Sequence, residues 1–471
     1  MSARRTVAGI DSSTQSCKIV TVDADTGEQL TQRSAPHPDG TSIDPARWWD
    51  AFLAAGGDEL GGGVAGGVAA LGVSAQQHGM VALDAADKPV HDALLWNDVR
   101  SAPQAAALTE RYGAQMWADE VGVVPVASFT ITKLAWLHAN RPELAAKVEQ
   151  VLLPHDWLTW NILGRPAQAA TDRSDASGTG YFSVHTNSYR MDLLEAALGR
   201  EARVPTVLGA SERAGVTPGG VVVSAGAGDN AAAALGLGIG EGDVVVSIGT
   251  SGTVFARTTA RIADASGSVA GFADAAGGQL PLLATINGAR TLVSTARMLG
   301  VDIERFGSLA LAAPADAGGL LLMPYLDGER TPNLPDASGS LTGMRRANMT
   351  PENLAQSSVL GLVCSLADAL DSLRGQGVAV RQVLLIGGGS QSPAVQKIAA
   401  DVFGVPVVLP AAREYVALGA ARQAAWALDG GSDFPSWPRA IALEFEPAAD
   451  RSWAAEVRAR YAEARGTIYG A

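Results

Sequence analysis

Apolar runs of strand length alternate with longer helical stretches along most of the chain. The first run, at 6–10, is followed by a polar tip at 11–16 and a second apolar run at 17–23, which predicts a β-hairpin. Its tip carries one carboxylate, Asp11, and several hydroxyls. Alternation of strands with helices is typical of an α/β fold.

A second hairpin is predicted just past the middle of the chain. An apolar strand at 243–248 leads into Gly249, Thr250, Ser251 and Gly252, and residues 253–257 return. The repeated plan suggests two similar halves, although two unrelated hairpins would give the same pattern. We expect an N-terminal domain over residues 1–238 and a C-terminal domain over residues 239–471.

Three further predicted strands end in small or polar residues. The strand at 68–75 ends in Gln76, Gln77 and His78. The strand that begins at 221 ends in the Gly-Asp-Asn turn that contains Asp229, and an alanine-rich helix follows. The strand at 383–386 runs into three glycines and is followed by a helix at 393–403. Glycine-rich and hydroxyl-rich turns after strands favour phosphate binding, because backbone amides can approach the anion closely.

Composition narrows the class of protein. The chain of 471 residues is longer than a single hydrophobic core usually accommodates, so we expect more than one domain. With 47% hydrophobic and 18% charged residues, its composition is that of a packed globular protein. A net charge of −13 disfavours nucleic acid and anionic membranes, so we expect neither as a partner. Two cysteines are too few for a disulfide framework. The sequence shows neither the pattern of a signal peptide nor an apolar run long enough to span a membrane. We therefore expect a cytoplasmic protein, and a homodimer is left open.

Several phosphate and hydrolase chemistries are excluded by the motifs. A P-loop needs Gly-Lys, and none of the five lysines follows a glycine. The glycine run at 236–240 is a weak match to a dinucleotide-binding motif, because it follows an alanine run instead of a strand. The G-x-S-x-G motif of serine hydrolases does not occur, and the six histidines do not have the spacing of zinc ligands. Phosphoryl transfer on two actin-like, ribonuclease H-like α/β domains with a central cleft remains, with ATP and Mg²⁺ as expected cofactors.

Two carboxylates are candidates for this chemistry. Asp11 would organise Mg²⁺, which takes few protein carboxylates and keeps several waters. Asp229, at a strand end beside Asn230, would accept the proton of a hydroxyl substrate. By position alone, Asp229 could equally cap the following helix.

At these residues the chain resembles the FGGY family of carbohydrate kinases, essentially end to end. The resemblance is carried by GAGDNAA at 226–232, SIGTSG at 247–252, SFTITKLAWL at 128–137 and DGERTP at 327–332. QQHG at 76–79 and LWNDVR at 95–100 look like the sugar-binding segments of the branch that phosphorylates ketopentoses. The chain departs from the family pattern at Ser13, where glycine is usual, at Gln77, which replaces a methionine, and at Leu360, which replaces an acidic residue.

The resemblance implies ATP-dependent phosphorylation of D-xylulose to D-xylulose 5-phosphate, with Asp229 as the catalytic base. The implied sugar-binding residues are Gln77, His78, Trp96, Asp98, Asp229 and Asn230. The implied ATP-binding residues are Thr14, Lys18, Gly249, Thr250, Ser251, Gly388, Gly389 and Ser392, and Asp11 would hold the metal. Two alternatives stay open: a kinase of another acceptor (L-ribulose, gluconate, glycerol or a tetritol), and an inactive sugar or nucleotide sensor on the same fold.

Overall fold

The structure, a computed structural model, describes residues 5–60 and 67–470. The chain divides into two compact units. Unit 1 contains Met1–Gly238, Arg261–Leu280 and Ala412–Arg439, and unit 2 contains Ile239–Ala260, Pro281–Ala411 and Ala440–Ala471. We expected one boundary after residue 238, but the segments Arg261–Leu280 and Ala412–Arg439 also belong to unit 1. The second of them carries a helix that packs on the first sheet.

Unit 1 is built on a mixed sheet with the strand order β13-β14-β5-β1-β2-β3, with β15 also paired to β5. The predicted first hairpin is present, since β1 and β2 pair antiparallel. The strands of this sheet are β1 (Thr6–Ser12), β2 (Ser16–Asp23), β3 (Gln29–Pro36), β5 (Ala70–Ala75), β13 (Arg213–Val216), β14 (Val222–Ser224) and β15 (Ala227–Gly228). The helices of unit 1 include α1 (Ala46–Ala54), α2 (Ala102–Tyr112), α4 (Thr130–Asn140), α6 (Pro154–Ile162), α7 (Arg173–Ser177), α8 (Met191–Leu198), α9 (Asp229–Leu237) and α14 (Tyr415–Asp429).

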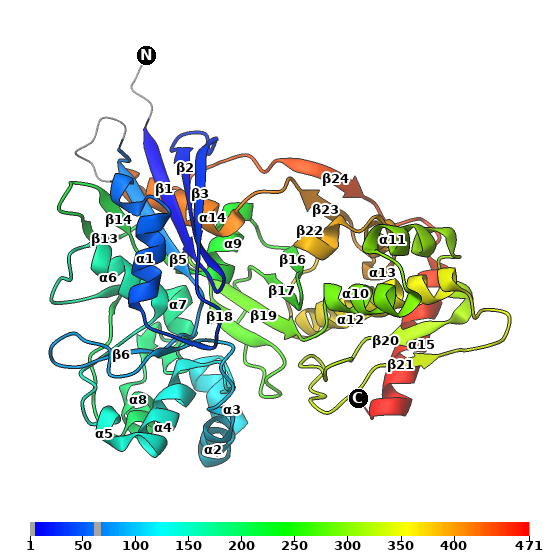
Figure 1. The fold of residues 1–471 in the computed structure, drawn as a ribbon, viewed down its shortest axis with the longest axis horizontal. Coiled ribbons are helices and arrows are strands. Elements are labelled where there is room, and N and C mark those ends of the chain that lie inside the picture. Colours follow the sequence, from blue (N-terminus) through cyan, green and yellow to red (C-terminus); the bar gives the residue numbers. More distant parts are fainter. Residues whose placement is uncertain (1–4, 61–66, 471) are drawn as a thin grey trace. The chain divides into compact units, whose positions relative to one another are not determined.

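Alternate residues of β1 face two different cores, as strand geometry requires. Ala8 and Ile10 belong to the core that includes Trp48 of α1 and the tryptophans of α6, whereas Val7 belongs to the core that includes α14. Figure 1 shows α14, in orange, beside the blue strands β1 and β2, from which it is far removed in sequence. An added Cβ on Gly9 would lie 1.8 Å from the carbonyl oxygen of Ala417, so glycine permits this close approach.

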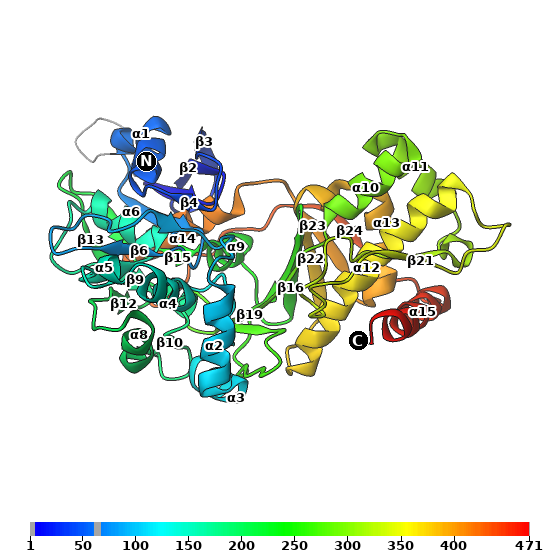
Figure 2. The same cartoon turned by 60° about the horizontal axis from the view of Figure 1, so that its bottom comes forward.

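Helix α14 also fixes α9, the helix that begins at Asp229. The two helices lie side by side in Figure 2 and pack through small residues. A Cβ on Gly419 would lie 1.8 Å from the carbonyl oxygen of Ala232, and a Cβ on Gly236 would lie 2.0 Å from that of Tyr415. Interhelical contact at this distance requires glycine on both helices. The return of the chain to unit 1 therefore holds the helix that carries the candidate base.

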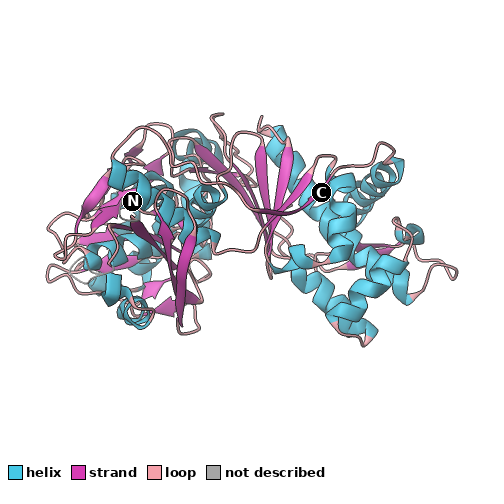
Figure 3. Ribbon diagram, turned by 90° about the horizontal axis from the view of Figure 1, so that it is seen from above, coloured by secondary structure: helices cyan, strands magenta, loops and turns pink. Residues whose placement is uncertain are grey.

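Unit 2 contains a second large sheet, whose strands within the unit follow the order β19-β17-β16-β22-β23-β24. The predicted second hairpin is present, since β16 and β17 pair antiparallel. Figure 3 shows these strands in magenta with cyan helices beside them. The elements are β16 (Asp243–Ile248), β17 (Gly252–Ala256), β19 (Gln279–Thr285), β20 (Leu321–Met323), β21 (Ser340–Thr342), β22 (Gln382–Ile386), β23 (Val407–Pro410), β24 (Ile441–Phe445), α10 (Ala289–Leu299), α11 (Ile303–Ala312), α12 (Pro351–Gly375), α13 (Pro393–Phe403) and α15 (Ser452–Tyr469).

Helix α12 is long and apolar enough to cross a membrane by length and composition, with a mean hydropathy of 1.2 over its most apolar window. However, 89% of that window is buried inside the structure, which is the environment of a core helix. Leu360 lies on this helix with no exposed surface. Leu360, one of the three residues that depart from the family pattern, therefore occupies a position in the hydrophobic core.

Candidate functional site

The polar residues that follow three strands of unit 1 meet at one edge of its sheet. Strand β5 is parallel to β1 and to β15, with Ser74 opposite both Asp11 and Ala227. One residue further, Ala75 lies opposite both Ser12 and Gly228. The segment after β5, with Gln77 and His78, and the start of α9, with Asp229, therefore leave the sheet at the same level as Asp11. The carboxyl edge of parallel strands is where α/β proteins bind their ligands.

Asp229 is the first residue of α9, and the N-cap position belongs to Gly228. One Asp229 carboxylate oxygen accepts hydrogen bonds from the backbone N–H of Asn230 at 2.8 Å and from its side-chain amide at 2.9 Å. A capping side chain would instead accept from an N–H two or three residues further along. The side chain of Asp229 is partly exposed to solvent, so it has the exposure that a residue contacting substrate needs.

Burial raises the pKa of Asp229 to about 7, and the neighbouring carboxylate of Asp11 contributes to the rise. A carboxylate normally gives up its proton near pH 4, where it is a weak base. A pKa near the working pH makes a carboxylate a stronger proton acceptor that is still substantially ionised. The environment of Asp229 therefore suits general base chemistry.

Asp11 is 3% exposed, and its carboxylate accepts a hydrogen bond from the hydroxyl of Ser13. Burial raises the pKa of Asp11 to about 6, against the effects of the Ser13 hydrogen bond and of Lys18. Because Asp11 in turn raises the pKa of Asp229, the two acidic side chains disfavour each other's ionised forms. A divalent cation would relieve this conflict, and hard carboxylate oxygens are ligands that Mg²⁺ accepts. The residues present thus fit a magnesium ion.

Gln77 and His78 are each fixed by the segment that contains α7. Gln77 is 5% exposed, and its side-chain amide donates to the carbonyl oxygen of Ser174 at 3.0 Å. Nδ1 of His78 lies 2.7 Å from the carbonyl oxygen of Gly178. Because a carbonyl can only accept, Nδ1 carries a proton in this hydrogen bond. The ring of His78 lies 4.9 Å from that of Phe129, which sets its orientation.

Trp96 and Asp98 play different parts in the loop at 95–100. The indole N–H of Trp96 donates to the hydroxyl of Thr14 at 2.8 Å, which joins this loop to the tip of the first hairpin. Asp98 is 3% exposed and accepts from Thr41 at 2.8 Å and from the Arg100 side chain at 2.8 Å. Burial raises the pKa of Asp98, but the hydrogen bonds from Arg100 and Thr41 outweigh it and the pKa lies below its ordinary value. Asp98 therefore anchors the loop as an ionised carboxylate.

Lys18, expected to bind ATP, forms an ion pair with Glu414 at 2.7 Å. Both side chains are about one-third exposed, and Glu414 directly precedes α14. In the sheet, Lys18 lies opposite Asp11. The ammonium group is thus placed beside the candidate metal residue.

In unit 2 the two glycine-rich turns that are expected to bind ATP, after β16 and after β22, also lie at one edge of a sheet. Strands β16 and β22 are parallel, with Ser247 opposite Ile386, so the glycines that follow each strand emerge together. A Cβ on Gly389 would lie 2.3 Å from the side chain of Ile248, so the turn packs closely against the end of β16. Gly388 and Thr250 are exposed at this edge. Ser392 directly precedes α13, at its N-cap position.

The DGERTP segment supports the tip of the second hairpin. Glu329 is 1% exposed and accepts from the backbone N–H of Ile286 at 2.6 Å and from the amide of Asn287 at 3.1 Å. These bonds hold the segment just before α10. The backbone N–H of Ala289, the first residue of α10, donates to the carbonyl of Gly249 at 2.8 Å. The motif therefore fixes the loop at 249–251 through α10.

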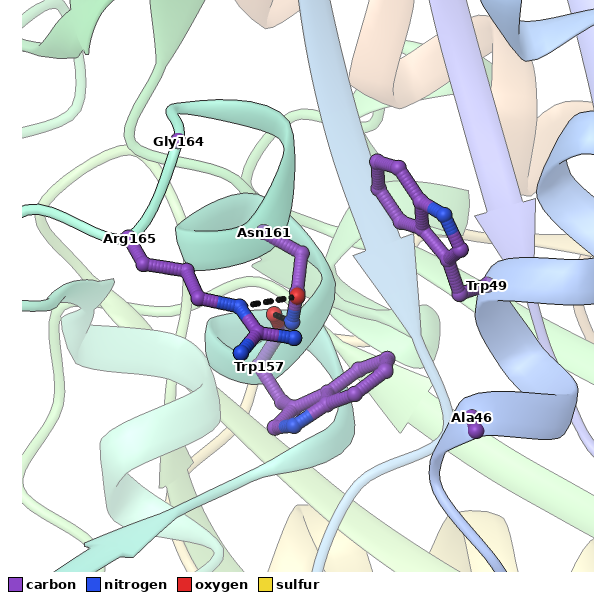
Figure 4. Close-up of a pocket in the computed structure, with 6 residues that line it drawn as sticks. All are labelled: Ala46, Trp49, Trp157, Asn161, Gly164 and Arg165. Atoms are coloured by element: carbon purple, nitrogen blue, oxygen red, sulfur yellow. Dashed lines mark hydrogen bonds between the residues drawn. The ribbon is translucent and has the colours of Figure 1, made fainter. Parts of the chain in front are cut away.

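A cavity of about 330 Å³ lies away from these residues, between α1 and α6. Figure 4 shows its lining, in which the guanidinium of Arg165 donates to the side-chain oxygen of Asn161 at 2.9 Å. The lining residues are Ala46, Trp49, Trp157, Asn161, Gly164 and Arg165. None of them is a predicted site residue. The cavity is therefore not part of the candidate site.

Sequence reasoning missed a group of buried polar residues behind the edge at Asp229. His155, Asp156 and Asp175 place their side-chain nitrogen and oxygen atoms within 4.8 Å of one another. Their only signal in the sequence is the adjacent pair His155-Asp156. Asp175 lies 20 residues after His155, and its position gives no recognisable spacing.

The chain is similar to known proteins over nearly its full length. The N-terminal domain of the FGGY family of carbohydrate kinases matches residues 6–236, and its C-terminal domain matches residues 244–428. The xylulose kinase of Streptomyces coelicolor is 46% identical over 90% of this chain and 88% of that protein. The xylulose kinase of Escherichia coli is 31% identical over 84% of each chain.

Solved structures give the same result for the fold. The crystal structure of xylulose kinase from Bifidobacterium adolescentis superposes with a TM-score of 0.91 and 43% identity, covering 99% of this chain and 100% of that one. The predicted two-domain α/β fold and the predicted family are confirmed. The predicted central cleft and the site assignments stay predictions. This chain therefore belongs to the FGGY family of carbohydrate kinases, ATP-dependent enzymes that phosphorylate sugars.

Proposed function

We propose that this protein transfers the γ-phosphoryl group of ATP to the 5-hydroxyl of D-xylulose, with Asp229 as the catalytic base. The observation that carries the proposal is the position of Asp229 at the carboxyl edge of the sheet, partly exposed and with its pKa raised to about 7. D-xylulose is chosen as acceptor because the curated relatives with 31% to 46% identity are named xylulose kinases.

In the proposed reaction, Asp229 removes the proton of the 5-hydroxyl as the sugar oxygen bonds to the γ-phosphorus. The bond between the γ-phosphorus and its bridging oxygen breaks, and the electron pair leaves with ADP. The proton then passes from Asp229 to water, so the products are ADP, D-xylulose 5-phosphate and a proton. Asn230, through its two hydrogen bonds to one carboxylate oxygen, orients Asp229 for this transfer.

The other site residues are proposed to bind and orient the substrates. Gln77 and His78 pair with sugar hydroxyls, which favours a ligand with matching hydroxyls over one that lacks them. Trp96, whose N–H is bonded to Thr14, contacts the sugar through its ring. The remaining sugar-side and nucleotide-side assignments are Asp98, Asn230, Thr14, Lys18, Gly249, Thr250, Ser251, Gly388, Gly389 and Ser392. Asp11 would hold Mg²⁺, which when bound neutralises phosphate charge and lowers the cost of phosphoryl transfer. The cytoplasm is the proposed location, where ATP is supplied.

The proposal is tested by measuring ADP release with a panel of acceptors at matched concentration: D-xylulose, L-ribulose, gluconate, glycerol and erythritol. We expect the highest kcat/KM with D-xylulose. A clear preference for glycerol or gluconate would replace the proposed acceptor. No ADP release with any acceptor, together with retained nucleotide binding, would favour the inactive sensor.

A further inference from the structure

Four ionisable side chains form a buried cluster in unit 1 that the proposed reaction does not use. His155 and Asp175 have no exposed surface, and Asp156 and Asp172 are each 1% exposed. His155 and Asp156 lie in the first turn of α6, and Asp172 and Asp175 lie at the start of α7. Carboxylates buried to this degree are destabilising unless a cation or hydrogen-bond donors pair with them.

The contacts of His155 determine its protonation state. Nε2 lies 2.9 Å from the carbonyl oxygen of Ala225, which can only accept, so Nε2 carries a proton. Nδ1 lies 3.1 Å from a carboxyl oxygen of Asp156 and 3.2 Å from one of Asp175, so it donates as well where these carboxyls are ionised. With both ring nitrogens donating, the ring is an imidazolium. The competing arrangement is a neutral ring whose Nδ1 accepts from a protonated Asp175, because burial raises the pKa of that carboxyl to about 7.

The surroundings of His155 agree with this state. Burial lowers the pKa of His155, but the hydrogen bonds with Asp156 and Asp175 raise it further, and the net pKa lies well above 6.5. The ionisable groups that face the ring are those two carboxylates and Asp172, and Tyr181 and Tyr189 lie against the same acidic group. The ring thus supplies positive charge beside these carboxylates.

The imidazolium contacts the segment that leads to Asp229. Ala225, whose carbonyl accepts from Nε2, is followed by Gly226, β15 and then Asp229. Gly226 has φ +81°, and an added Cβ would lie 1.8 Å from Nε2 of His155, so the ring packs directly on the backbone. A second hydrogen bond, from the Gln423 amide to the carbonyl of Gly226 at 2.8 Å, holds the same turn.

The imidazolium also holds α7, which contacts two further parts of the site. The hydroxyl of Ser174 accepts from the backbone N–H of Gly228 at 3.2 Å, directly before Asp229. The carbonyl of Ser174 accepts from Gln77. Because Asp175 is the next residue, its contact with His155 fixes the orientation of this turn. One buried cation thus joins the strand end before Asp229 to the helix that holds Gln77.

We propose that His155 is a positioning residue for phosphoryl transfer, acting as a buried imidazolium that fixes the backbone leading to Asp229 and the helix that holds Gln77. This inference rests on the proposed role of Asp229 as the base. His155 does not touch the substrate. The charged ring satisfies both contacts at once, whereas a neutral ring does so only if Asp175 keeps a proton and donates it to Nδ1.

A metal ion held by His155, Asp156 and Asp175 is the competing interpretation. The described residues of this group offer three ligand atoms, whereas a structural zinc site takes four. The second oxygen of Asp156 already accepts from the backbone N–H of Leu153 at 2.8 Å. The contacts therefore favour the imidazolium, and the experiments below separate the two.

The protonation state is tested directly, without any activity assay. In protein labelled with ¹⁵N-histidine, we expect the His155 ring to show two protonated nitrogens at pH 8, and the assignment follows from loss of the signals in His155→Gln. A ring with one protonated nitrogen would overturn the proposal. So would a stoichiometric metal in the purified protein, measured by elemental analysis, that is absent from His155→Gln.

The positioning role is tested with His155→Gln and His155→Lys, and with His91→Gln as the control. Gln is neutral, and we expect kcat to fall about 10- to 100-fold while the Kd for ATP stays within about twofold. Lys restores a cation, so we expect it to recover most of the lost kcat. His91 contacts the carbonyl oxygen of Asp92 at the surface, and its variant should match the wild type.

Each outcome of this comparison supports or overturns the inference. A folded His155→Lys that is no more active than His155→Gln would show that the charge is not what matters. Equal kcat in wild type and His155→Gln would show that the ring does not position Asp229. If the wild type turned over no acceptor at all, the proposed function would fail, while the NMR result would still decide the charge of His155. If His155→Gln did not fold, His155→Lys would serve in its place, because it also removes the ring signals for the assignment and its kcat can be compared with that of the wild type.

Discussion

Replacing Asp229 by Asn should abolish most activity and yet stabilise the protein above neutral pH. The two hydrogen bonds from Asn230 reach one side-chain oxygen, which Asn retains, so the local fold should persist. Loss of a general base lowers rates by about 10²- to 10⁴-fold, or about 3 to 5 kcal/mol of transition-state free energy. Because the proton acceptor acts only in the chemical step, kcat should fall while the KM for sugar stays within about threefold.

The predicted gain in stability follows from the pKa of Asp229. Its rise from 3.8 to about 7 means that the fold disfavours the ionised carboxylate. This cost is absent below the unfolded pKa and complete above the folded one, with an upper bound of about 4 kcal/mol. Since the side chain is partly exposed, solvent screening should reduce it to about 1 to 3 kcal/mol. The Asn variant carries no such cost.

Two assays check this prediction. Steady-state ADP release with D-xylulose gives the ratio of kcat, and urea unfolding of the apoprotein between about pH 4 and pH 9 gives the difference in unfolding free energy. We expect the variant to gain stability relative to wild type as the pH rises from the unfolded pKa through about 7. A kcat within about tenfold of wild type would refute the catalytic role. A difference in stability that does not change with pH would refute the environment assigned to the carboxylate.

Three further predictions concern the surroundings of the base. Asp11→Asn should raise the Mg²⁺ concentration for half-maximal activity by about tenfold or more, measured by a metal titration, because a carboxylate ligand is lost; an unchanged titration would exclude Asp11 as the metal residue. Gly9→Ala should lower the free energy of unfolding by about 2 kcal/mol or more, because its Cβ would meet the backbone of α14, whereas Gly240→Ala, with nothing within 4 Å, should change it by less than about 0.5 kcal/mol; equal urea midpoints would contradict this. Trp96→Phe removes the 2.8 Å hydrogen bond to Thr14 and should raise the KM for sugar about two- to tenfold in the ADP-release assay, with kcat little changed; an unaffected KM would remove Trp96 from the sugar site.

Much of the fold could be predicted because its signals are local. Both hairpins and helix α13 follow from apolar runs separated by polar or glycine-rich turns, and strand β16 has the bounds 243–248 that the pattern indicates. The ends of elements are less well determined by local pattern. The sequence places Asp44 at the N-cap and Pro45 at the first helical position, whereas α1 begins at Ala46 with Pro45 at the N-cap, and Asp44 accepts from the N–H of Ala46 at 3.0 Å.

The return of the chain at 261–280 and 412–439 to unit 1 could not be predicted from local pattern. Helix α14 is an alanine-rich segment in the sequence, and its partner surface on β1 lies near the opposite end of the sequence. The contact is possible because Gly9 and Gly419 have no side chains. The sequence shows the two glycines, but not which backbone approaches each of them.

The candidate base shows the same limit. By sequence, Asp229 was a residue at a strand end that could equally cap a helix, and its motif indicated a kinase. The structure places Gly228 at the N-cap position and raises the pKa of Asp229 through burial and the nearby Asp11. Burial and the separation of two charges depend on three dimensions, so composition and spacing could not supply them.

The sequence by itself determined the α/β class, the two phosphate-type hairpins and the family, because these depend on short-range periodicity and on contiguous motifs. Only the tertiary structure decided which residues surround the base. His155 and Asp175 are 20 residues apart and carry no motif, yet they meet in a buried cluster behind Asp229. The free-energy effect of a buried charge depends on which groups exclude water from it, and those groups are brought together only when the chain is packed.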